Sequence, residues 1–254
     1  MAVYIFRRLI QMIPVMLGVT LVVFLIMQLV PGDPARMLAG EGATPEQIEA
    51  VRQSLGLDRP MIEQYMTYLG NVLQGDLGKS MITNAPVLEE ILIRLPTTVE
   101  LALASIVVAV TIGLLAGIVS ATKQNSWADM SIMVVALLGV SMPSFWIGLM
   151  LMYYFSVELG WFPVAGWDTP AHMILPALTL GSGGAAIIAR MSRASMLEVI
   201  RQDYIRTARA KGVSRFKIIF KHALKNALIP IITVVGLQCG VLLGGTVLTE
   251  SVFA

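Results

Sequence analysis

Long uncharged stretches interrupt the sequence, and each is close to the length of a membrane-spanning helix. A bilayer core about 30 Å thick needs roughly 20 apolar residues in a helix. Because the unpaired backbone groups of an open strand cannot be satisfied in lipid, we expect helices. The pattern predicts five spans, at residues 9–30, 99–121, 130–157, 173–189 and 227–249. The third is longer than one straight span requires and contains Pro143, so we expect it to be kinked or tilted.

The remaining charges predict which ends of the spans face the cytoplasm. Arg7 and Arg8 precede the first span, and Lys123 lies between the second and the third. Residues 190–226 hold ten Lys or Arg against two acidic residues, whereas residues 31–98 hold five basic and nine acidic residues. Because cytoplasmic segments of membrane proteins carry an excess of Lys and Arg, we expect a cytoplasmic N-terminus and an external acidic segment.

The acidic segment carries signals for a small helical cap rather than an independent domain. Thr44-Pro45-Glu46-Gln47 is typical of a capping box with proline at the first helical position, and Gly56 can end that helix. Pro60 is expected to start a second helix that runs to about Leu73. A third is expected from Pro86 to Leu95, ending before Pro96.

The basic segment predicts two short helices. Residues 203–211 form the first, and Gly212 breaks it. Ser214 can cap the second, which is expected from Arg215 to about Ile229 and to end at Pro230. This second helix is amphipathic, which is typical both of a helix on anionic lipid and of an element that docks a cytoplasmic partner. The first has no wide apolar stripe, so a lipid surface alone accounts poorly for it.

The composition agrees with a membrane protein and excludes several other classes. Hydrophobic residues make up 56% of the chain and charged residues 13%, about half the charged share of a soluble domain. A net charge of +2 gives no bulk electrostatic case for binding nucleic acid. The single cysteine, Cys239, and the distant His172 and His222 lack the clustering that a metal site requires.

No residue pattern predicts catalysis by this chain. Gly78-Lys79-Ser80 resembles the end of a P-loop, but Leu73 stands where the first glycine is required. Ser182 lies among glycines without the G-x-S-x-G pattern of a serine hydrolase, and helix packing accounts for it better. No span has an ionisable residue near its middle, which argues against an ion-coupled carrier. A secondary transporter and an intramembrane hydrolase stay as alternative functions.

Four glycines lie together on the fifth span. Gly236, Gly240 and Gly244 recur every four residues, with Gly245 beside them. Such a stripe lets another backbone approach closely. The stripe either contacts the fourth span of the same chain, or it forms a subunit contact or part of a translocation path.

Several motifs together resemble the permeases of binding-protein-dependent ABC importers, in the branch for peptides and nickel. The run 203–212 resembles the coupling segment of these permeases, and four further motifs match that branch in the family's order. These are His222-Ala223-Leu224-Lys225-Asn226-Ala227-Leu228-Ile229-Pro230, Pro31-Gly32-Asp33-Pro34, Ser54-Leu55-Gly56-Leu57-Asp58 and Gly244-Gly245-Thr246-Val247. The resemblance covers essentially the whole chain.

The resemblance implies an all-α polytopic membrane protein with the fold of a type I ABC importer permease, in a bacterial cytoplasmic membrane. It implies an N-terminal tail and first span (1–30), an extracytoplasmic helical segment (31–98) and a core permease domain (99–254) with a cytoplasmic coupling loop (190–226). Family members continue with a sixth span, which we expect to be missing from this chain.

The same resemblance implies a transport subunit with no cofactor of its own. Its expected partners are a homologous second permease, two cytoplasmic ATP-binding subunits that hold ATP and Mg, and an extracytoplasmic solute-binding protein. ATP-driven closure of those subunits would push the coupling helix and switch the cavity between its outward- and inward-facing states. Dipeptides, longer peptides, glutathione and nickel complexes are all possible cargo.

The coupling segment departs from the general permease motif at one place. That motif begins Glu-Ala-Ala, and this chain has Arg206, Thr207 and Ala208 there, so no salt bridge can be assigned to the motif's Glu. The residues implied to couple to the ATPase are Asp203, Tyr204, Arg206, Thr207, Ala208, Arg209, Ala210, Lys211 and Gly212.

Overall fold

The structure is a computed structural model that describes residues 2–29, 32–40, 42–80, 82–245 and 247–253. Pro31 and Thr246, which belong to two of the motifs above, lie outside these residues. The described part is all-α, and its only β pairing is an isolated bridge between Lys79 and Pro86. The chain divides into two compact units, Met1–Arg94 and Leu95–Ala254.

The apolar stretches form the expected spans. Four helices are long and apolar enough to cross a membrane: Val3–Leu29, Val87–Thr122, Pro170–Ile200 and Arg215–Gly244. The fifth candidate is a pair of helical segments, Trp127–Ser141 and Ser144–Glu158, which meet at an angle of 105°. The kink expected at Pro143 is therefore a full break. Pro143 follows extended Met142, and its ring disfavours a helical conformation at that preceding residue.

The first unit contains α1 (Ala2–Leu29) and three short helices, α2 (Pro34–Ala39), α3 (Pro45–Ser54) and α4 (Met61–Leu73). Thr44 and Gln47 form the expected capping box, and Gly56 follows α3 with a left-handed φ of 66°. Tyr65 of α4 hydrogen-bonds Thr20 of α1 at 3.0 Å. Gln28 of α1 also donates to Gln64 of α4 at 3.0 Å, so two side-chain hydrogen bonds join these helices.

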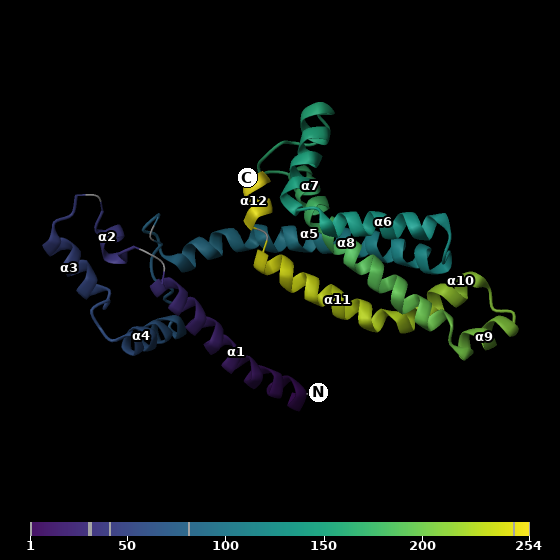
Figure 1. The fold of residues 1–254 in the computed structure, drawn as a ribbon, viewed down its shortest axis with the longest axis horizontal. Coiled ribbons are helices and arrows are strands. Elements are labelled where there is room, and N and C mark those ends of the chain that lie inside the picture. Colours follow the sequence, from purple (N-terminus) through teal and green to yellow (C-terminus); the bar gives the residue numbers. More distant parts are fainter. Residues whose placement is uncertain (1, 30–31, 41, 81, 246, 254) are drawn as a thin grey trace. The chain divides into compact units, whose positions relative to one another are not determined.

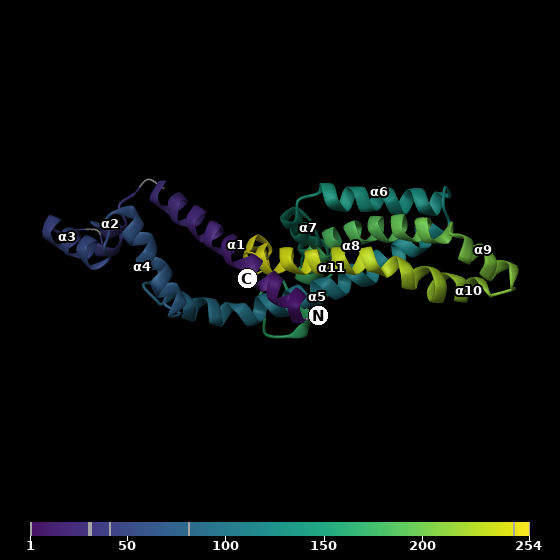
Figure 2. The ribbon, with the colours of Figure 1, turned by 90° about the horizontal axis from the view of Figure 1, so that it is seen from below.

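The second unit is a bundle of α5 (Val87–Thr122, from Leu95 on), α6 (Trp127–Ser141), α8 (Pro170–Ile200) and α11 (Leu224–Gly245). These helices run side by side in Figures 1 and 2. At one end lie α9 (Asp203–Ala210), α10 (Arg215–Lys217) and the π-helix η2 (Ile218–Ala223). At the other end lie α7 (Ser144–Leu151), with its π-helical extension η1 (Met152–Glu158), and α12 (Val247–Phe253).

Small residues allow α5 and α8 to approach closely. A Cβ at Gly117 would lie 2.4 Å from Ser192 Cβ, and one at Gly113 would lie 2.6 Å from the Ala185 carbonyl oxygen. From α8, a Cβ at Gly181 would lie 2.7 Å from Val108. The Gly181–Ala186 region therefore packs helices together, as expected for Ser182 and its neighbours.

Two expected helix ends are wrong. Pro96 lies inside α5 and Pro230 lies inside α11, although we expected each to end a helix. A proline removes one backbone hydrogen bond, and an apolar helix in a bilayer can keep all its others. The helix of the fourth span continues eleven residues past Ala189 to Ile200. Charge at Arg190 can limit how much of a helix enters lipid, but it does not end the helix.

Candidate functional site

The segment expected to couple to a partner forms a separate short helix, α9, between α8 and α10. Asp203 occupies its first turn, where the positive end of the helix dipole stabilises a negative charge. At the other end Gly212 has a left-handed φ of 76°. The Val213 amide donates to the Ala208 carbonyl at 3.1 Å and the Gly212 amide to the Arg209 carbonyl at 3.0 Å. This pair of bonds is a Schellman motif, so α9 ends at a defined point.

One face of α9 is fixed to the second unit. Ile205 is fully buried in the core cluster that includes Met196 and Ile218. The Tyr204 hydroxyl accepts a hydrogen bond of 2.6 Å from Asn226 Nδ2. It also lies 3.4 Å from the His222 carbonyl oxygen, to which it donates. Ile205 was not among the residues expected to couple, and it anchors them.

The other face of α9 is exposed and charged. The side chains of Asp203 and Arg206 are 94% and 72% exposed, and they form an ion pair at 3.4 Å across one helical turn. Thr207 and Arg209 are also exposed. Of the residues expected to couple to the ATPase, Ala208 packs against the core. Tyr204 is exposed but its hydroxyl bonds within the chain. The full exposed set is Asp203, Tyr204, Arg206, Thr207, Arg209, Ala210, Lys211 and Gly212.

A cavity of about 430 Å³ lies beside α9. Its wall includes Arg209, Arg215 and apolar residues such as Ile200 and Ile219. Arg215 donates to the Thr122 carbonyl at 3.3 Å, so the cavity adjoins the end of α5.

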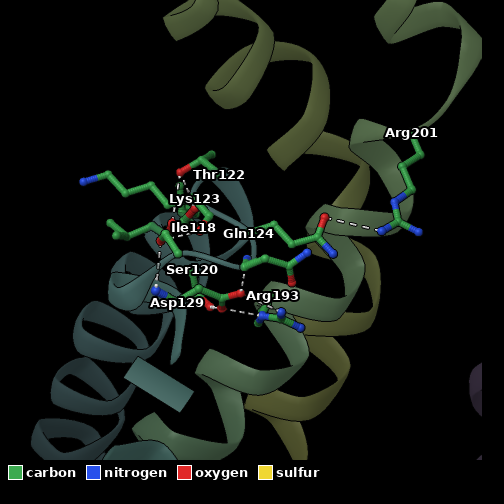
Figure 3. Close-up of polar contacts among 11 residues, drawn as sticks. Ile118, Ser120, Thr122, Lys123, Gln124, Asp129, Arg193 and Arg201 are labelled. Carbon is green, nitrogen blue, oxygen red and sulfur yellow. Dashed lines mark hydrogen bonds and ion pairs between the residues drawn. The ribbon is translucent and has the colours of Figure 1, made fainter. Parts of the chain in front are cut away.

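An ion pair that no sequence motif predicts joins α6 and α8, with the Asp129 carboxylate buried and the Arg193 side chain 27% exposed. Arg193 donates through Nε and Nη2 to the two carboxylate oxygens of Asp129, at 2.7 and 2.8 Å (Figure 3). Ser120 Oγ and the Asn125 amide also donate to this carboxylate. Ser126 and Asp129 have the spacing of a helix N-cap, which the sequence does show, and Ser126 accepts from the Asp129 amide at 3.3 Å. Arg193 is 64 residues from Asp129, and no local pattern points to it.

The glycine stripe of α11 does not meet α8. Within the described part of the chain, a Cβ at Gly236, Gly240 or Gly244 would have no heavy atom within 4 Å outside its own helix backbone and chain neighbours. The helix instead buries Ala227 and Ile231 in the core cluster shared with α8. Of the two readings of the stripe, contact with the fourth span of the same chain is therefore not found. Gly245 is the last residue of α11.

Both histidines take part in hydrogen bonds within the chain. His172 lies at the start of α8, where its Nδ1 is 2.8 Å from the Thr169 hydroxyl as part of a helix cap. The His222 carbonyl belongs to the contacts of Tyr204. Among the described residues, no group of three or more His, Cys, Asp or Glu side chains is placed to hold a metal ion.

Two family models together match nearly the whole chain. Residues 109–254 match the binding-protein-dependent transport system inner membrane component, and residues 1–102 match the N-terminal membrane component of the same transport systems. The exposed helix α9 and the ion pair of Asp129 and Arg193 both lie within the first match.

Curated relatives are similar over most of their length. The glutathione transport system permease protein GsiC of Escherichia coli strain K12 is 48% identical over 98% of this chain and 82% of its own. The GsiC protein of Pectobacterium atrosepticum is 50% identical over the same shares. The dipeptide transport system permease protein DppB of Alkalihalophilus pseudofirmus is 47% identical over 100% of this chain and 85% of its own.

Proposed function

This chain belongs to the family of binding-protein-dependent transport system inner membrane components, and we propose that it moves glutathione or short peptides inward. It is a multi-pass permease subunit of an ABC importer in the inner membrane. The names of its relatives, which transport glutathione and dipeptides, support this cargo class. The scarcity of buried charge in its spans agrees with a carrier whose energy comes from a partner subunit.

The proposed complex contains three further kinds of subunit. A homologous second permease completes the pathway, and a solute-binding protein delivers cargo on the external side. Two ATP-binding subunits bind on the cytoplasmic side and hold ATP and Mg, so that ATP hydrolysis occurs outside this chain. With the basic residues of 190–226 on the cytoplasmic side, the N-terminus is cytoplasmic as well.

In this proposal, α9 is the element through which the ATP-binding subunits act. The single observation that carries it is the two-sided character of α9. Ile205 is fully buried, while Asp203 and Arg206 on the same short helix are almost fully solvated. A helix that is fixed on one side and charged on the other can receive a force from a partner and pass it to the bundle. Arg206, Arg209 and Lys211 offer cations to acidic side chains of that partner.

The test uses the whole complex reconstituted in liposomes with cargo-loaded binding protein. Arg209→Glu reverses an exposed charge on α9 and should lower cargo-stimulated ATP hydrolysis and uptake together. Lys217→Glu makes the same charge change on exposed α10 and is the matched control. Gly212→Pro should have the stronger effect, because proline holds φ near −65° where Gly212 has +76°, and it lacks the amide that bonds Arg209.

Normal coupling in both α9 variants would refute the docking role. The alternative functions give different outcomes in the same preparation. A secondary transporter would lose uptake with an ionophore and keep it without ATP. An intramembrane hydrolase would cleave substrate as an isolated chain.

A further inference from the structure

The corner between α5 and α6, residues 120–129, contacts the chain on both sides of α9. Asp129 forms the bidentate ion pair with Arg193 of α8. Gln124 accepts from Arg201 at the end of α8, at 3.4 Å, and the Thr122 carbonyl accepts from Arg215 at the start of α10, at 3.3 Å. Figure 3 shows the first two of these contacts reaching from one corner to two places along α8.

The Asp129 carboxylate has little water and many donors. The residue is 3% exposed, and its two oxygens accept from Arg193, from Ser120 and from the Asn125 amide. These donors come from α5, from the turn and from α8, so one carboxylate joins three elements. Arg–carboxylate pairs with two parallel hydrogen bonds fix orientation as well as distance.

Such a pair is poorly explained by stability alone. Removing two charges from water costs free energy that their attraction repays only when the geometry is good, and neutral replacement of both partners is often harmless to stability. Loss of one partner is different, because it leaves an uncompensated buried charge. A variant that replaces both partners therefore tests the role of the pair in geometry without leaving a buried charge, whereas a variant of one partner also lowers stability.

We infer that the α5–α6 corner is a positioning element for the coupling helix, with the Asp129–Arg193 pair at its centre. Arg193 lies on α8 and precedes Asp203, the first residue of α9, by ten residues. By fixing α8 to α5 and α6, the pair makes these helices move as one body when α9 is displaced. The inference rests on the proposed coupling role of α9, and it adds Asp129 and Arg193 to the residues on which coupling depends.

The first test measures position and does not depend on ATP. Spin labels are attached at two exposed sites in a Cys239→Ala background. Trp127→Cys lies at the start of α6, and Ser214→Cys lies at the N-cap of α10, after α9. The full permease complex should give a narrow distance distribution. Arg193→Met should broaden it, and Arg190→Met should not, because Arg190 is an exposed arginine of α8 outside the pair. An unchanged distribution in Arg193→Met would overturn the inference and leave the function of α9 untouched.

The second test separates geometry from stability through the double variant Asp129→Asn/Arg193→Met. Without a buried charge, its complex should assemble and melt like the wild type. Its cargo-stimulated ATP hydrolysis should nevertheless stay about tenfold low, a typical size for coupling between sites. Wild-type stimulation in the double variant would show that the pair serves stability only, and would overturn the inference. If Arg209→Glu and Gly212→Pro both prove silent, the proposed docking role fails, whereas the distance measurement still decides the positioning role.

Discussion

Glycine sets how closely α5 and α8 approach, and it does so where backbone faces backbone. The space around Gly117 is closed by Ser192 Cβ and by the Ala189 carbonyl oxygen, 2.7 Å from a Cβ position. Ser192 is fully buried, and among the described residues its hydroxyl has no hydrogen-bond partner. The contact therefore depends on shape rather than on polar bonds. Gly236 has an equally small side chain and open space around it.

Gly117→Ala should destabilise the isolated permease chain. The added methyl has to displace backbone of α8, and overpacking of this kind costs about 1–3 kcal/mol. Thermal unfolding of the purified chain in detergent measures the change. Gly236→Ala is the matched control, and it should be neutral or slightly stabilising because alanine favours a helix by up to about 1 kcal/mol over glycine. Equal melting shifts in the two variants would contradict the packing assigned to Gly117.

At the scale of elements, local chemistry predicted helix caps better than it predicted the effect of prolines. Thr44 and Gln47 cap α3 and Gly212 closes α9, because caps are made by residues adjacent in sequence. Pro96 and Pro230 lie within helices, because a lipid environment favours a helix with one missing bond over any open backbone.

The candidate site also has a part that the sequence predicts and a part that it does not predict. The exposed run of α9 could be found from a contiguous motif, whereas its anchors could not. Ile205 is buried by residues of α8 and η2, and Arg193 meets Asp129 only after the bundle has formed. Long-range pairing of single side chains leaves no periodic signal in the sequence.

The contact between Tyr204 and Asn226 should hold α9 closed against the start of α11. Tyr204→Phe removes the hydrogen bond of 2.6 Å from Asn226 and the longer bond of 3.4 Å to the His222 carbonyl. Because the second bond is long and exposed, the loss is worth about 0.5–1.5 kcal/mol. Amide hydrogen exchange across 203–210 measures the local opening free energy, which should fall by that amount. Asn226→Ala should have a similar effect, and the double variant should add little to either. Fully additive effects would show that the two groups do not interact.

At the scale of the whole chain, membrane topology follows from where charge is absent and from the path of the bundle. The end of α5, the start of α6, the end of α8 and the start of α11 lie at one end of the second unit, and α7 lies at the other (Figure 1). Because α6 and α8 lie side by side, the broken pair of α6 and α7 carries the chain from one end to the other before α8 returns. The four long helices and this broken pair, counted as one span, make up to five crossings.

Cysteine labelling tests this path in intact cells. In a Cys239→Ala background, Asp168→Cys lies before α8 and Lys123→Cys lies in the α5–α6 corner, and both positions are exposed. A membrane-impermeant maleimide should label Asp168→Cys from outside, whereas Lys123→Cys should react only after permeabilisation. The physical reason is that α6 with α7 crosses the bilayer between Lys123 and Asp168. Helix α8 then crosses it again between Asp168 and the basic cytoplasmic loop. Labelling of both positions from the same side would mean that α6 and α7 form a re-entrant loop and do not cross the bilayer.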